Sequence, residues 1–192
     1  MPAQNEETDR IMEENVNEKN IGDSLYKRHK KVYNWGEKFQ KTVESGGHAV
    51  LIGEFDHNID KKGRMILPAK LREELGDSVI VNRGLDGCLY VYTKEQWEKV
   101  YQRLSTLPST RKDARMYARM MLSKAAECEF DAQGRILIPA GLVKLAHLQK
   151  ECKIIGVGTH VEIWDKDTWL ALEEEQNDCF EDVAESLTEF EL

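Results

Sequence analysis

The sequence predicts a mostly β fold with added helices, in which two copies of one unit form a single pseudo-symmetric β-barrel with flanking helices. Two observations lead to this prediction. A twelve-residue segment at 60–71 returns at 131–142 with six identical positions. Each copy is then followed by the same order of short apolar runs and a helical stripe. A unit of about forty-five residues is too small to enclose a core alone, and two units that close on each other also remove exposed strand edges.

The first copy contains signals for each of its elements. Asp60 and Gly63 suit a tight turn, because an aspartate bonds its own backbone two residues on and glycine accepts a positive φ. Pro68 suits the first turn of a helix, and Thr93 suits the N-cap of another. The predicted elements of this copy begin with a short strand followed by another half-buried one within 50–59. Strands at 64–67, 79–81 and 89–92, a helix at 69–75 and a closing helix after residue 93 complete it.

The second copy predicts the same order, with one extra residue between its short helix and the next strand. Its expected elements are strands at 128–130, 136–138, 154–155 and 161–164, and a helix at 140–148. The connecting segment 109–124 predicts a helix with one basic face, and 166–192 predicts a single helix with an apolar stripe and an acidic face. The predicted division is a disordered or untranslated extension at 1–49, repeat one at 50–98, linker helices at 99–124, repeat two at 125–170 and an acidic helix at 171–192.

Charge is distributed unevenly along the chain. The net charge is −8, yet residues 1–24 account for −5 and residues 173–192 for −9, which leaves +6 on residues 25–172. Strong binding to phosphate therefore requires the bases to gather on one face or to be multiplied by assembly. The four cysteines form no C-x-x-C pair, which favours a reducing cytoplasm over a zinc site or a disulfide framework. No cofactor or metal is predicted.

The turn at 60–64 suits recognition better than catalysis. It offers one acid and one guanidinium, without a nucleophile or a phosphate-cradling glycine run. Arg64 presents a planar fork that matches a phosphate or the O6/N7 edge of guanine, and Lys61 and Lys62 add positive charge. The simpler interpretation is that Arg64 only braces the hairpin through Asp60.

The second turn weakens that simpler interpretation, because the same arrangement recurs. Asp131 and Gly134 repeat the structural positions of the turn, and Arg135 repeats the guanidinium. Ala132 and Gln133 replace the two lysines, so this turn is less basic. A duplicated turn that presents arginine is what a binding surface with internal symmetry requires.

Two other interpretations remain as alternatives. An oligomeric scaffold or interaction protein would use the arginine turns to grip an acidic partner, without preference among DNA sequences. A hydrolase would use the Asp56–His57 region. A metal site at Asp56, His57 and Asp60 is set aside, because no second cluster in the sequence completes it.

The motifs resemble those of the MraZ family, bacterial transcriptional regulators of the division and cell-wall gene cluster. The resemblance covers roughly residues 50–192 and rests on both copies. The matching segments are Gly53-Glu54-Phe55, Asp60-Lys61-Lys62-Gly63-Arg64, Pro68-Ala69-Lys70-Leu71-Arg72, Arg83-Gly84-Leu85-Asp86-Gly87-Cys88-Leu89, Glu127-Cys128-Glu129-Phe130-Asp131 and Ile155-Gly156-Val157.

The resemblance implies a fold, a site and an assembly. Each repeat is expected to be a SpoVT/AbrB-type swapped-hairpin half. Arg64 and Arg135 are expected to contact double-stranded DNA, together with Lys61, Lys62 and Arg72. The protein is expected to form a homo-oligomeric ring in the cytoplasm, associated with the nucleoid. It is expected to bind repeated sites upstream of its own operon and to repress it. One departure is that Val143 stands where the family pattern has an arginine equivalent to Arg72.

The first forty-nine residues have no counterpart in the family pattern, and we expect that they are not translated in the cell. Family members begin with Met-x-x-Gly-Glu, which 50–54 matches if a GTG codon at Val50 is the true start. The intact mass of the native protein is therefore expected to equal that of residues 50–192. A mass that includes these residues would contradict the prediction.

Overall fold

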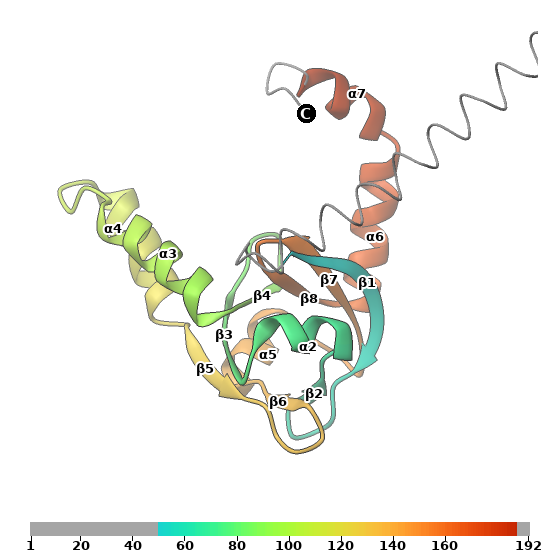
Figure 1. The fold of residues 1–192 in the computed structure, drawn as a ribbon. Helices are drawn as coiled ribbons and strands as arrows, with labels where there is room; N and C mark the ends of the chain where they lie inside the picture. The colour runs from blue at the N-terminus through green and yellow to red at the C-terminus, as the bar shows by residue number, and fades with distance from the viewer. Residues whose placement is uncertain (1–49, 188–192) are drawn as a thin grey trace, which may run out of the picture. The chain divides into compact units, whose positions relative to one another are not determined.

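The computed structural model describes residues 50–187, so the predictions for 1–49 and for the end of the C-terminal helix lie outside this range. Figure 1 shows the main sheet, with α3 and α4 on one side and α6 and α7 on another. The strands are β1 (Leu51–Asn58), β2 (Arg64–Ile66), β3 (Ser78–Arg83), β4 (Leu89–Tyr92), β5 (Ala126–Glu129), β6 (Arg135–Leu137), β7 (Glu151–Gly158) and β8 (Val161–Asp165). The helices are α2 (Ala69–Leu75), α3 (Lys94–Ser105), α4 (Lys112–Leu122), α5 (Ala140–Leu145), α6 (Lys166–Asn177) and α7 (Phe180–Ser186).

The main sheet is built by exchange of strands between the two repeats. Its six strands are antiparallel and lie in the order β1-β7-β8-β4-β3-β5. Strand β1 of repeat one pairs with β7 of repeat two, and β5 of repeat two pairs with β3 of repeat one. The order reads the same from either end when each strand is replaced by its equivalent. These pairings are the exchange that a swapped hairpin requires.

A pseudo-two-fold axis relates the repeats, and two strand pairs lie on it. In the separate two-stranded ribbon of β2 and β6, Met65 lies opposite Ile136, its own equivalent in the other repeat. In the centre of the main sheet, Tyr90 of β4 lies opposite Glu162 of β8, again an equivalent pair. The two-fold relation predicted from the repeated segment is therefore present in the register.

The prediction of a closed barrel is wrong. Strands β1 and β5 end the sheet at opposite sides, and no pairing joins them within residues 50–187. The reason is that α2 and α5 cover the core where further strands would otherwise be needed. Leu71 and Leu75 of α2 and Leu142 of α5 are buried in one hydrophobic cluster with the strands. Because helices bury this surface, the sheet gains little by closing.

The C-terminal helix also differs from its prediction. The single helix expected from residue 166 is broken between α6 and α7, at Asp178 and Cys179. Neither helix has a basic residue in its last turn to offset its acidic side chains. The predicted apolar stripe is exposed, with Phe180 at 70% and Val183 at 47% of full exposure, so packing does not hold one long helix together.

The offset between the repeats is larger after α5 than predicted. Helix α5 ends at Leu145 rather than at residue 148, and His147 takes a positive φ of 52°. Asn58 pairs with Glu151, whereas its equivalent Glu129 pairs with Ser78, so two residues rather than one are inserted before β7. The β7–β8 connection is one residue shorter in compensation.

The central ribbon pair provides a test of the packing. Met65 and Ile136 are fully buried, so Met65→Ala or Ile136→Ala is expected to lower the free energy of unfolding by about 2–5 kcal/mol. Ile66→Ala is the matched control, because Ile66 lies on the same strand with 44% exposure and is expected to cost far less. Urea unfolding followed by circular dichroism measures both. Equal losses at Met65 and Ile66 would contradict this placement of the core.

Candidate nucleic-acid interface

The first turn is organised by the carboxylate of Asp60. Its Oδ1 accepts hydrogen bonds from the backbone N–H of Lys62 at 2.8 Å and of Arg64 at 2.9 Å. Its Oδ2 accepts from Arg64 Nε at 2.7 Å and lies 2.6 Å from Arg64 Nη2. Gly63 takes a φ of 82° and closes the turn through its N–H to the carbonyl of Asp60. One carboxylate therefore holds both the turn and one edge of the guanidinium.

The backbone and side-chain hydrogen bonds from Arg64 lower the pKa of Asp60 to about 2. In the second turn, the backbone and side-chain hydrogen bonds from Arg135 lower the pKa of Asp131. Both carboxyl groups are thus charged at neutral pH, as the predicted ion pairs with Arg64 and Arg135 require.

The second turn repeats this geometry with one difference. Asp131 accepts from the backbone of Gln133 at 2.9 Å and of Arg135 at 3.0 Å, and from Arg135 Nε at 2.7 Å. Arg135 Nη2 donates instead to the side-chain oxygen of Gln133, at 2.8 Å. Among residues 50–187, the guanidinium of Arg135 is therefore hydrogen-bonded to two side chains, whereas that of Arg64 is bonded to one.

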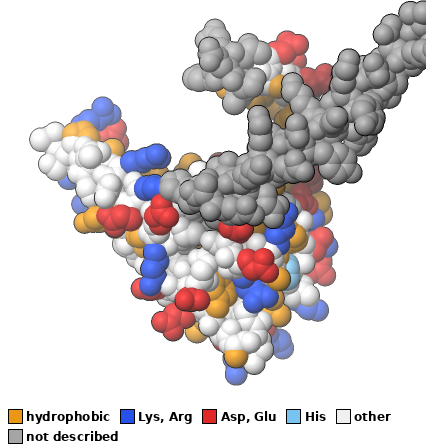
Figure 2. Space-filling model, viewed as in Figure 1, with side chains coloured by type: hydrophobic (Ala, Val, Ile, Leu, Met, Phe, Trp, Pro, Cys, Tyr) orange, Lys and Arg blue, Asp and Glu red, His pale blue; other side chains and the backbone are white. Residues whose placement is uncertain are grey.

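The β2–β6 register places both arginines on one face of the ribbon. Arg64 lies opposite Leu137, and Ile66 lies opposite Arg135. Since side chains alternate along a strand, these four share the face opposite to the buried Met65 and Ile136. Ile66 and Leu137 are exposed by 44% and 57%, so this face points outward. Figure 2 shows Lys and Arg side chains around the end of the molecule where the ribbon lies.

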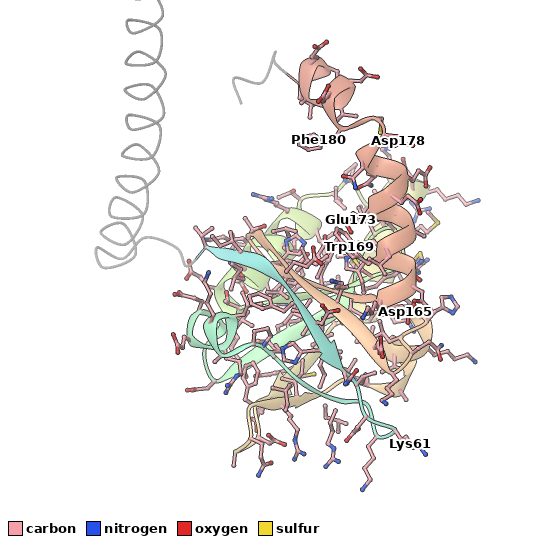
Figure 3. All side chains as sticks on the ribbon, turned by 90° about the vertical axis from the view of Figure 1, so that its right-hand side faces the viewer. Lys61, Asp165, Trp169, Glu173, Asp178 and Phe180 are labelled. Carbon is pink, nitrogen blue, oxygen red and sulfur yellow. The ribbon has the colours of Figure 1, made fainter. Side chains whose placement is uncertain are left out.

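The two lysines of the first turn are exposed. Figure 3 shows Lys61 projecting from the end of the molecule opposite to Phe180 and Asp178. Helix α7 and the basic turn therefore lie at opposite ends of this part of the chain.

Arg72 has a different position from the two turn arginines. It is half-buried on α2, and its Nε donates to the carbonyl of Leu67 at 3.0 Å. Its guanidinium packs against Gly134 so closely that a Cβ there would lie 2.2 Å from Nη1. Val143, the equivalent residue on α5, lies near Gly63 but less closely, since a Cβ at Gly63 would lie 3.8 Å from Val143 Cγ2. Each helix thus supports the turn of the other repeat, and Arg72 braces the second turn.

The Asp56 and His57 region shows structural contacts. Asp56 accepts a hydrogen bond from Lys153 at 3.3 Å and lies 3.5 Å from the Nζ of Lys166, and the Lys153 hydrogen bond is the main cause of its lowered pKa. Burial lowers the pKa of His57. Within residues 50–187, no group of three histidine, cysteine or acidic side chains is arranged to hold a metal ion.

The four cysteines are free thiols in the structure. Cys88, Cys128 and Cys152 are buried, and Cys179 is exposed. Burial raises the pKa of Cys128 to about 11 and that of Cys152 to about 12, so neither is an activated nucleophile.

Sequence analysis missed three basic residues that lie beside the first turn. Lys144, His147 and Lys150 follow one another at three-residue spacing around the end of α5, and they line a cleft together with Lys61 and Lys62. The spacing is visible in the sequence. Their proximity to the first turn depends on the exchanged pairing of β1 with β7, which brings residue 150 beside residue 59.

Two strand-exchanged repeats, each with an Asp-x-x-Gly-Arg turn on a shared ribbon, define a duplicated swapped-hairpin protein. The family model described as "MraZ protein, putative antitoxin-like" matches the chain twice, at residues 50–120 and 121–191. The chain therefore belongs to the MraZ family. No helix between residues 50 and 187 is both long enough and apolar enough to cross a bilayer.

The low pKa of Asp60 gives a prediction about acid stability. A carboxyl group whose pKa is lowered on folding stabilises the protein above its unfolded pKa, and this contribution is lost as the pH falls through the folded value. Asp60→Asn is therefore expected to lower the urea midpoint at pH 7, and the difference from wild type is expected to shrink between about pH 4 and pH 2. A difference that stays constant down to pH 2 would show that the charge of Asp60 does not stabilise the turn.

Proposed function

We propose that this protein is a sequence-specific DNA-binding transcriptional regulator. In this proposal it represses the division and cell-wall gene cluster, including its own promoter. The observation that supports it most is the placement of Arg64 and Arg135 on one outward face of the β2–β6 ribbon. A two-stranded β-ribbon is one of the elements that enter the major groove of DNA.

The geometry of Arg64 suits the recognition of a base edge. Asp60 holds Nε and Nη2 along one side of the guanidinium, while Nη1 has no hydrogen-bond partner among residues 50–187. The outer end of the fork is thus available and already oriented. An arginine fork matches O6 and N7 of guanine, and its restraint before binding reduces the entropy lost on contact.

The surrounding residues have supporting roles in this proposal. Lys61 and Lys62 contact the phosphate backbone beside the first turn, where no sequence is read. Arg72 acts through its contact with Gly134, and it also adds positive charge beside the second turn. Asp60 and Asp131 hold the two guanidinium groups and leave their outer ends for DNA.

Assembly of several copies would compensate for the modest positive charge of residues 25–172. We propose that copies of the chain form a ring, which presents the ribbon many times along one duplex in the nucleoid. Exposed apolar side chains support association between copies, notably Met116, Met120 and Leu122 on α4, with exposures of 40–54%. Binding to several repeated sites then multiplies a weak single contact.

Arginine substitutions test the proposed DNA contact. Arg64→Ala and Arg135→Ala are each expected to weaken binding to the DNA upstream of the gene by about 1–3 kcal/mol, the usual value of a bidentate base contact. Fluorescence anisotropy at fixed salt measures the affinity. Arg103→Ala is the matched control, because Arg103 is an exposed arginine on α3, away from the ribbon.

Sedimentation velocity on each variant checks that assembly is unchanged. Unaltered affinity in both turn variants would remove the arginines from the DNA contact. Binding of wild type to all duplexes with equal affinity would favour the scaffold that grips an acidic partner.

A further inference from the structure

A cleft lies between the first turn and the end of α5. Its volume is about 550 Å³, and its walls come from 59–63 of repeat one and from 140–150 of repeat two. The basic residues that line it are Lys61, Lys62, Lys144, His147 and Lys150. It lies at the edge of the ribbon that carries Arg64, so a ligand in the cleft would lie beside the proposed DNA contact.

Among residues 50–187, the lysines of this cleft are not paired with acidic side chains. None of the four lysines makes an ion pair with another residue in the described range 50–187. The acid in the wall is Asp60, whose carboxylate is already committed to Arg64. An open cleft with four uncompensated ammonium groups attracts an anion.

The residues equivalent to this cleft, beside the second turn, have the same backbone arrangement but carry different charges. Ile59 N–H donates to the carbonyl of Lys150 at 3.0 Å, and the equivalent Phe130 N–H donates to that of Asp77 at 3.3 Å. Lys150 therefore corresponds to Asp77. By the repeat offset, Lys144 corresponds to Glu73 and His147 to Gly76. The lysines of the turn correspond to Ala132 and Gln133.

This comparison shows that the positive charge is not a by-product of the fold. The same backbone carries four lysines on one side, and two acids together with Arg72 on the other. The pseudo-symmetry thus provides an internal control, because geometry is shared and only the side chains differ.

The loop that carries Lys150 is held in place from two directions. Its backbone is bonded to Ile59, and the N–H of Gln149 donates to Asp165 Oδ2 at 3.0 Å. Asp165 is itself buried and caps α6. The lysines therefore project from a fixed backbone, which reduces the cost of ordering them around a ligand.

We propose that this cleft binds adjacent phosphate groups of the DNA backbone and makes the contact between protein and duplex one-sided. Lys144 and Lys150 join Lys61 and Lys62 as phosphate ligands, and the corresponding side of repeat two makes no such contact. The inference rests on the proposed DNA-binding function. It predicts one orientation of the protein on its DNA site, in which the side of the first turn contacts the DNA phosphate backbone.

The salt dependence of DNA binding tests this proposal. The double variant Lys144→Ala, Lys150→Ala is expected to reduce the slope of log affinity against log salt concentration by about 2, because each phosphate contact contributes about 0.9. The control Lys99→Ala, Arg103→Ala removes two exposed basic residues from α3 and is expected to leave the slope unchanged. All four side chains are exposed, so the variants are expected to keep the wild-type circular dichroism spectrum.

A second arm uses inorganic phosphate alone, followed by the amide NMR signals of residues 144–150. Equal salt slopes in wild type and the cleft variant, with sequence-specific binding intact, would contradict phosphate binding in the cleft. The proposed function would be unaffected by that result. Phosphate-dependent shifts in a wild-type protein that shows no preference among duplexes would overturn the proposed function. That result would also replace the DNA backbone with a free phosphate as the ligand.

Discussion

The reciprocal exchange of first strands is the constraint on which the rest of the structure depends. Eight residue pairs join β1 to β7, and the shorter β5 pairs with β3 in the equivalent way. Each turn is then completed by the other repeat, since the carbonyl of Gly63 accepts from Ile138 and that of Gly134 accepts from Leu67. Each turn thus receives one backbone hydrogen bond from the other repeat in addition to the bonds within it, so the proposed interface is tied to the core.

The period of a β-strand explains how three residues in each ribbon strand serve two purposes. The central residue, Met65 or Ile136, enters the core, and its neighbours face outward. The outward arginine needs no support from the core, because the turn carboxylate holds it. Recognition chemistry and packing are thus separated by one position along the chain, which lets the outer residues vary while the buried pair is retained.

Much of this arrangement was predictable from the sequence, because the signals are local. The Asp60 turn, the helix after Pro68 and the Thr93 cap each depend on neighbouring residues, and the structure contains all three, with Gln96 completing the cap. The open sheet was not predictable, since it depends on how α2 and α5 pack. The role of Arg72 against Gly134 and the cleft beside Lys150 require contacts across the repeats, which no local pattern reports.

The charge reversal between Lys150 and Asp77 has a consequence for how such a chain can diverge. A homodimer of single-repeat subunits must present identical residues at both symmetric positions, because one gene encodes them. Joining the two halves in a single polypeptide removes that requirement. Each half can then accumulate its own substitutions without disturbing the shared core. The fused molecule can accordingly serve targets that are not palindromic, which an assembly of two identical halves cannot distinguish by orientation.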